Sequence, residues 1–179
     1  MNWDTAFLII YKVKLHIFYN NANSNIVMMK FLEMTMKKNK YLRNIGKYVV
    51  LFLIGGLGYY CIEVVNRGYS HWSMFLCGGA CFVMTGMINQ ALGFEVSLVS
   101  QMIIAGIIIT ELEFITGSIV NLWMKWDVWD YSEVPYNILG QICLPYSLLW
   151  IGLSVIAILL DDYLRYRLFG ERKATYKIF

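Results

Sequence analysis

The sequence predicts an all-α integral membrane protein, a helical bundle with about four transmembrane helices. Of its 179 residues, 59% are hydrophobic and only 15% are charged, and the mean hydropathy is +0.54. Ordinary soluble domains carry about a quarter charged residues, so this chain has too few charges for a water-facing surface. The apolar residues are also gathered into long blocks, which indicates that lipid is their solvent.

Four apolar blocks are each long enough to cross a bilayer, which takes roughly 18 or more residues. They cover residues 48–65, 72–89, 97–120 and 138–160. Because no water reaches the bilayer core to satisfy backbone amides, we expect each block to be a helix. Glycine pairs inside the blocks agree with this, since small residues let membrane helices approach closely.

Basic residues lie on both sides of this predicted transmembrane domain, which we place at residues 45–163. Five precede the first block: Lys37, Lys38, Lys40, Arg43 and Lys47. Five more lie after the fourth block: Arg165, Arg167, Arg172, Lys173 and Lys177. The positive-inside rule then predicts that both termini are cytoplasmic, in a multi-pass protein of the cell membrane. The connections 66–71 and 121–137 are expected on the outer side.

The flanking regions are residues 1–44, an extension with a basic cytoplasmic segment, and residues 164–179, a basic interfacial tail. Residues 7–19 are too short an apolar stretch to span, and Lys12, Lys14 and His16 interrupt it. This stretch either lies along the membrane surface or belongs to an upstream extension that is not translated, and we favour the second. In the tail, a helix with Asp161 and Arg165 one turn apart is expected at the cytoplasmic interface.

Acidic residues inside the predicted spans are the candidates for a functional site, because intramembrane charges usually face a bundle interior or a wet cavity. At 100° per residue, Glu113 shares a helix face with small and polar residues, whereas Glu111 lies among isoleucines. Glu63 lies on the glycine- and tyrosine-bearing stripe of the first span. We therefore expect Glu63 and Glu113 to face the interior and to meet in the outer half.

Polar and aromatic groups gather at the same predicted level. The candidate substrate or ion site comprises Glu63, His71, Glu113, Asn121, Asp130, Tyr131 and Asn137, and the candidate lid comprises Trp126, Asp127 and Trp129. One interpretation makes the tryptophan- and acid-rich connection a lid over a polar cavity that holds a cation, a proton or a cationic head group. The other makes it an interfacial aromatic belt, with the glutamates as neutral structural donors.

Several chemistries have no support in the sequence. It contains no G-x-x-x-x-G-K-[ST] phosphate loop, no H-E-x-x-H and no G-x-S-x-G, so we assign no catalytic residue and no cofactor. Cys77 and Cys81 share a helix face, but two thiols fall short of the four ligands of a structural zinc site, and no metal is expected. The small net charge of +3, with no interleaved basic patch, excludes a nucleic-acid partner.

Three stretches carry a resemblance to a known family: EVVNRGYSHWSMFLCGGACFVMTGMIN, ELEFITGSIVN and WDVWDYSEVPYNILGQICLPYSLLW. About residues 45–170 resemble the bacterial family of ABC-transporter permeases named ABC transporter type IV. The matching positions are Glu63, Arg67, Gly78, Gly79, Asn89, Glu113, Gly117, Asn121, Trp129, Asp130, Tyr131, Ser132, Pro135, Asn137, Gly140 and Trp150. The resemblance implies a permease-like transport subunit whose partners are the lipid bilayer, a separate ATPase subunit and further copies of the chain.

Two alternatives remain beside transport. One is an accessory or structural subunit that stabilises a membrane complex through its glycine-rich helix faces. The other is a membrane enzyme that acts on a lipid head group, with Glu113 or Asp130 as acid or base. We favour transport over the accessory role, and the accessory role over an enzyme.

Overall fold

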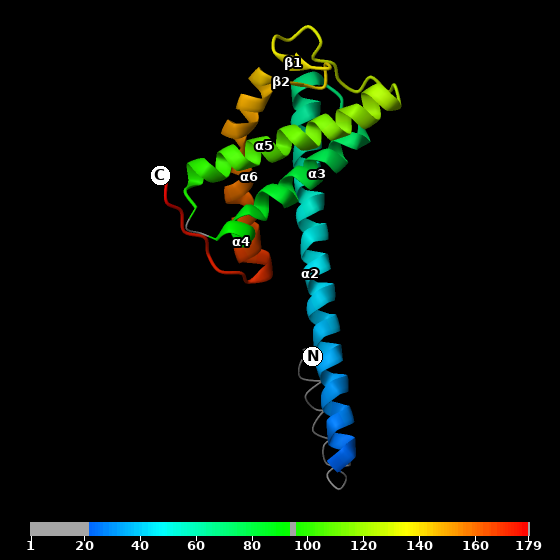
Figure 1. Cartoon of the computed structure of the whole chain (residues 1–179), viewed down its shortest axis with the longest axis vertical. Helices are drawn as coiled ribbons and strands as arrows, with labels where there is room; N and C mark the ends of the chain where they lie inside the picture. Colours follow the sequence, from blue (N-terminus) through cyan, green and yellow to red (C-terminus); the bar gives the residue numbers. More distant parts are fainter. Residues whose placement is uncertain (1–21, 94–95, 179) are drawn as a thin grey trace. The chain divides into compact units, whose positions relative to one another are not determined.

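The computed structural model describes residues 22–93 and 96–178 and is built mainly of helices (Figure 1). It divides into two compact units, residues 1–46 and 47–179, which are described separately. The described part of the first unit, from Ala22, belongs to helix α2 (Ala22–Arg67). The expectations for residues 7–19, His16 among them, fall outside the described residues.

The second unit holds the rest of α2 and the remaining elements. These are α3 (Trp72–Gly86), α4 (Ile88–Leu92), α5 (Leu98–Gly117), a π-helix (Ser118–Trp123), the strands β1 (Asn137–Ile138) and β2 (Ile142–Cys143), and α6 (Leu144–Phe169). In the described part of the chain four helical stretches are long and apolar enough to cross a membrane: Tyr41–Arg67, Trp72–Leu92, Leu98–Trp123 and Leu144–Phe169. The prediction of an all-α, four-span bundle is confirmed.

Helix α5 packs against both α3 and α6, and Figure 1 shows α3 and α5 crossing α6 obliquely. The strands and the turn between α2 and α3 lie at one end of the unit, which we call the loop end. Helix α4 and the segment that follows α6 lie at the other, which we call the tail end. Buried Met74, Val120 and Trp129 form an apolar cluster toward the loop end, and Ile88, Ala105 and Ile158 form another toward the tail end.

The fourth span begins later than predicted. Residues 138–143, expected to be helical, instead form an antiparallel two-stranded ladder in which Asn137 pairs with Cys143 and Ile138 with Ile142. Two positive backbone φ angles, +52° at Leu139 and +69° at Gly140, turn the chain between these strands. Helix α6 starts after them at Leu144, and Pro145 lies in its first turn, where a missing N–H costs little.

The helix expected after Asp161 is the last part of α6. Helix α6 continues to Phe169 and ends at Gly170, whose φ of +67° is the left-handed conformation typical of a helix C-terminus. Asp161 and Arg165 form an ion pair one turn apart, and both are buried (0% and 1% exposed), so this pair faces the interior of the fold. The interfacial position of the tail stays a prediction. The chain after Gly170 returns to α5, where Leu98 N–H donates to the Lys177 carbonyl at 2.7 Å.

Glycines set the close approach of α2 and α3. A methyl group at Gly55 would overlap the Cβ of Phe82, and one at Gly78 would overlap the Cβ of Tyr59. Gly58, one turn after Gly55 on the same helix, has no neighbouring atom within 4 Å of such a methyl group. The glycines on the buried side of α2 therefore serve packing, as expected for membrane helices, and Gly58 does not.

Substitution of Gly55 by alanine tests this contact. We expect Gly55→Ala to lower the melting temperature in mild detergent by about 2–10 °C, because overpacking costs about 1–3 kcal/mol. Gly58→Ala is the matched control on the same helix and should leave the melting temperature unchanged or slightly higher, since alanine favours helix over glycine. Equal melting temperatures for the two variants would contradict the packing of α2 on α3.

Candidate functional site

A cavity of about 1020 Å³ lies at the loop end of the second unit. Its walls come from the last turns of α2, from the loop between the π-helix and β1, and from the first half of α6. The acidic residues of the wall are Glu63, Asp127 and Asp130, and the aromatic ones are Tyr59, Tyr69, Trp129, Tyr131, Tyr146 and Trp150. Arg67 is the basic residue among those that line it. We call this cavity the acidic pocket.

Glu113 of α5 lies behind the wall of the acidic pocket. Its side chain is buried (3% exposed), as the helical geometry of the sequence predicted, whereas Glu111 is exposed. Trp150 Nε1–H donates to Oε2 at 2.6 Å, and the Tyr59 hydroxyl donates to Oε1 at 3.5 Å. Both donors are neutral, and in the described part of the chain no cationic side chain pairs with Glu113. A buried carboxylate without a countercharge is costly, which marks this position for explanation.

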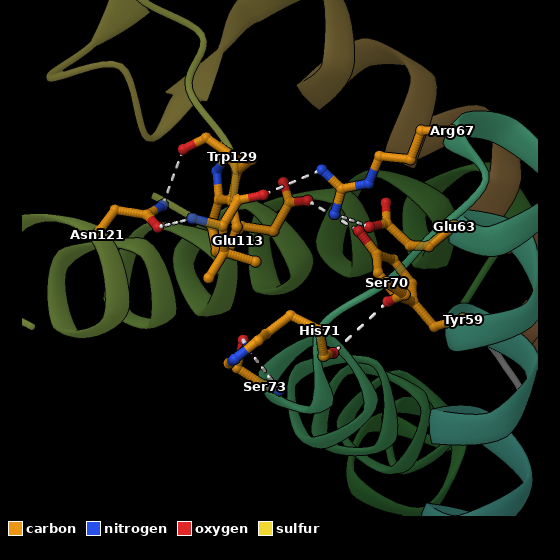
Figure 2. A network of polar contacts seen from close by, with 10 residues as sticks. Tyr59, Glu63, Arg67, Ser70, His71, Ser73, Glu113, Asn121 and Trp129 are labelled. Atoms are coloured by element: carbon orange, nitrogen blue, oxygen red, sulfur yellow. Dashed lines mark hydrogen bonds and ion pairs between the residues drawn. The ribbon is translucent and has the colours of Figure 1, made fainter. Parts of the chain in front are cut away.

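Glu63 has a different environment. Its carboxylate forms an ion pair with Arg67, one turn later on α2, and Arg67 Nη1–H also donates to the Val128 carbonyl at 3.1 Å (Figure 2). The guanidinium lies 5.2 Å from the ring centre of Tyr69, within cation–π range. The charge of Glu63 is thus compensated, and Arg67 connects α2 to the loop that roofs the pocket.

Asn121 anchors this loop to the end of α5. Its side-chain amide donates to the Trp129 carbonyl at 3.0 Å and to Gln141 Oε1 at 2.8 Å, and its Oδ1 accepts from Val128 N–H at 2.7 Å. The π-helix widens the chain at Ser118–Trp123 and places this buried side chain under the loop. Trp129 Nε1–H donates to the Gln141 carbonyl at 2.9 Å, which closes the same network. Asn121 therefore holds the loop and does not line the pocket.

The loop itself adopts a conformation that few sequences favour. Lys125, Asp127, Tyr136 and Leu139 all have positive φ angles, the conformation that residues with a Cβ adopt rarely. A methyl group at Gly140 would come within 2.6 Å of both Asp130 Oδ1 and the Ser132 hydroxyl, so the hairpin lies tightly against the loop. Such strain persists only where surrounding contacts fix it, and it concentrates at functional sites.

Asp130 and Tyr131 line the acidic pocket, as predicted for site residues. Asp130 is exposed and accepts from the Ser132 hydroxyl at 2.5 Å and from Ser132 N–H at 2.8 Å, and these bonds lower the pKa of its carboxyl. Tyr131 stacks on Tyr146 with ring centres 4.8 Å apart, and burial raises the pKa of its phenol. Asp130 therefore stays ionised at neutral pH and presents a negative charge at the mouth of the pocket.

Asn137 and His71 lie near the pocket without lining it. Asn137 Nδ2–H donates to the carbonyls of Ser132 and Val134, so this residue shapes the loop. His71 caps α3, with its Nδ1 accepting from Ser73 N–H at 3.3 Å (Figure 2). Both side chains thus have partners within the fold, and their part in binding stays a prediction.

The three residues predicted as a lid separate into two groups. Asp127 and Trp129 line the acidic pocket. Trp126 instead packs beside the start of α3, its ring centre 5.3 Å from that of His71 and 5.6 Å from that of Trp72. The structure brings Glu63, Asp127, Trp129, Asp130 and Tyr131 together around one cavity, with Glu113 behind its wall.

A second polar cluster, at the tail end, was not singled out from the sequence. Asp162 accepts from Asn89 Nδ2–H at 2.5 Å and from the Tyr176 hydroxyl at 2.7 Å, beside the buried Asp161–Arg165 pair. Lys47 pairs with Glu171 at 2.5 Å on the same side. The signal in the sequence was the pair of adjacent aspartates at the end of an apolar run. Among the described residues, no group of three or more His, Cys, Asp or Glu side chains is placed to hold a metal ion.

Comparison with known proteins adds the family. Residues 49–176 match the model of the family described as Putative ABC-transporter type IV. The chain belongs to this family. No curated protein and no solved structure matches the chain. The match covers the four spans from Val49 onward, the acidic pocket and most of the tail-end cluster. Together, the family and the four span-length helices indicate a membrane protein of a transport-related family.

The anchoring role of Asn121 gives a stability test for this ABC-transporter type IV member. We expect Asn121→Ala to lower the melting temperature by about 3–10 °C, because it leaves buried partners unpaired at a cost of about 1–3 kcal/mol each. The loop 124–136 should also become sensitive to added protease. Asn66→Ala, which removes an exposed amide at the end of α2, is the control. An unchanged melting temperature and a protected loop in Asn121→Ala would contradict the anchor.

Proposed function

We propose that the chain is a permease-like transport subunit that binds a cationic solute in the acidic pocket. The observation that carries this proposal is the buried carboxyl group of Glu113 behind the pocket wall, which among the described residues bonds to the neutral donors Tyr59 and Trp150 and to no cation. A cation in the pocket would supply the countercharge that the described residues do not.

The electrostatics of the wall favour the same class of solute. Arg67 is already engaged by Glu63 and by the loop, whereas Asp127 and Asp130 present uncompensated charge at the mouth. Six aromatic rings surround the cavity, and aromatic faces attract amines and quaternary ammonium groups within about 6 Å. Anionic solutes would meet repulsion from the carboxylates of Asp127 and Asp130.

Orientation and energy supply complete the proposal. The basic residues before the first span and after the fourth favour cytoplasmic termini, and with that orientation the loop end and its pocket would lie on the outer side of the cell membrane. The sequence contains no phosphate-binding loop of its own, so ATP hydrolysis must come from a separate ATPase subunit. Four spans are few for a complete transport path, which favours assembly with further copies of the chain.

Rearrangement of the loop would couple binding to transport. Arg67 bonds the loop at Val128, and Asn121 bonds it at Val128 and Trp129, so the roof of the pocket is tied to the ends of two spans. A change in the angle between α2 and α5 would therefore move the roof directly. No covalent step enters this mechanism, and the absence of enzymatic activity stays a prediction.

The glycine-packed contact of α2 with α3 favours a second function, that of an accessory subunit that stabilises a membrane complex. In this case the glutamates would act only through hydrogen bonds within the fold. The two functions differ in what a change at Glu113 affects: flux in the first, assembly in the second.

Native purification and flux assays separate them. We expect tagged protein purified from native membranes to carry an ATPase in fixed ratio. The variant Glu113→Gln should keep that ATPase but lower uptake of the transported cation by about 10–100-fold, which is the effect of losing a charge-assisted contact. Glu111→Gln, on the exposed face of the same helix, is the control and should transport normally. Loss of the ATPase or of protein abundance with unchanged flux per complex would favour the accessory function instead.

A further inference from the structure

A second, apolar cavity of about 200 Å³ adjoins the acidic pocket. It lies between α2, α3 and α6, and nearly all of its lining is apolar. Four residues line both cavities: Tyr59 and Ile62 of α2, and Trp150 and Leu153 of α6. The two cavities therefore meet at the aromatic pair Tyr59 and Trp150, whose ring centres are 5.8 Å apart.

The combined groove changes in character along its length. At the loop end it is acidic and aromatic, and past Tyr59 and Trp150 it becomes apolar along α2 and α6. Its edges are exposed apolar side chains within the spans, with Ile62 at 59% and Ile156 at 61% exposed. In a bilayer this flank faces lipid, so the apolar cavity, which we call the apolar arm, is open to the hydrocarbon. The acidic pocket lies at the loop end of the same two spans, where the loop 127–131 completes its wall.

A buried carboxyl group lies at the junction of the two parts. Glu113 accepts hydrogen bonds from both Tyr59 and Trp150 from behind, and has no ion pair in the described part of the chain. Arg67 is the basic residue of the acidic wall, and Glu63 and the Val128 carbonyl already engage its guanidinium. The groove thus presents net negative charge where a head group would lie and an apolar surface where a chain would lie.

We propose that the occupant of this groove is an amine-bearing membrane lipid, with its amine in the acidic pocket and an acyl chain in the apolar arm between α2 and α6. This inference rests on the proposed function for the cationic solute and adds its source, the bilayer in place of the aqueous phase. A small cation would use the acidic pocket alone and leave the apolar arm without a role. An anionic lipid would bring its head group against Glu63, Asp127 and Asp130.

Gly58 offers a clean way to block the arm. It lines the apolar cavity, and a Cβ atom built there has no neighbour within 4 Å, so we expect a leucine to extend into the groove while the fold is kept. Gly152 of α6 is equally open and lines neither cavity, which makes Gly152→Leu the matched control. Ala157→Leu enters the same arm from α6 and is the second blocking variant.

The experiment measures binding to the purified full chain in detergent by native mass spectrometry. The probes are lysophosphatidylethanolamine, lysophosphatidylglycerol of the same chain length, and ethanolamine. We expect the amine lipid to bind more tightly than the other two, and Gly58→Leu and Ala157→Leu to weaken it by about tenfold or more, the share that about two buried methylenes supply. Gly152→Leu should bind as the parent does.

Three results would overturn the inference: equal affinity for the two lipids, equal affinity for ethanolamine and the amine lipid, or binding that both blocking variants leave unchanged. None of these depends on an ATPase. If the amine lipid fails to bind but an ATPase copurifies and Glu113→Gln abolishes flux, the proposed function stands and only the lipid is wrong. If the lipid binds but no ATPase is recovered, the lipid site stands and the transport proposal falls.

Discussion

One buried carboxylate connects three of the four spans. Glu113 extends from α5 and accepts hydrogen bonds from Tyr59 of α2 and Trp150 of α6, so the geometry of the bundle at this depth depends on it. In the described part of the chain no cationic side chain pairs with this carboxyl group. A fold that needed only a polar link could use a neutral amide here, because burying an uncompensated charge is expensive. That cost is the reason why the proposed function gives Glu113 a part in binding as well as in structure.

The loop over the pocket depends on a second buried side chain, Asn121. Through Val128, Trp129 and Gln141 it fixes a segment whose backbone is strained at several positions, and Arg67 fixes the same segment from α2. Pocket wall, loop and span ends therefore form one connected polar network (Figure 2). Because the network crosses from one helix to another, a movement between helices changes the pocket, which is the property that a transport subunit requires.

Hydrophobic periodicity and length were enough to predict the spans and the inward face of Glu113, because both follow from helical geometry and the cost of exposing charge to lipid. The late start of α6 was missed, because residues 138–143 continue the apolar run of the fourth span. The positive φ angles at Leu139 and Gly140, which turn these residues into a hairpin, cannot be seen in the hydrophobic pattern. Asn121, Asn137 and His71, which the sequence made site candidates, bond in the structure to the loop, to its hairpin turn and to the start of α3. Their part in binding stays a prediction. Sequence shows that a side chain is polar and roughly how deep it lies, but not which nearby backbone group satisfies it.

The most direct test is the accessibility of position 113 from the pocket. In a background with Cys61, Cys77, Cys81 and Cys143 replaced, single cysteines at 63, 111 and 113 are treated with a small cationic, membrane-impermeant thiol reagent. Cysteine at 113 should react from one side of the membrane only, more slowly than cysteine at 63, while cysteine at 111 on the lipid-facing side should stay unmodified. Modification at 111 but not at 113 would contradict the account, because Glu113 would then face no pocket that a cation can enter.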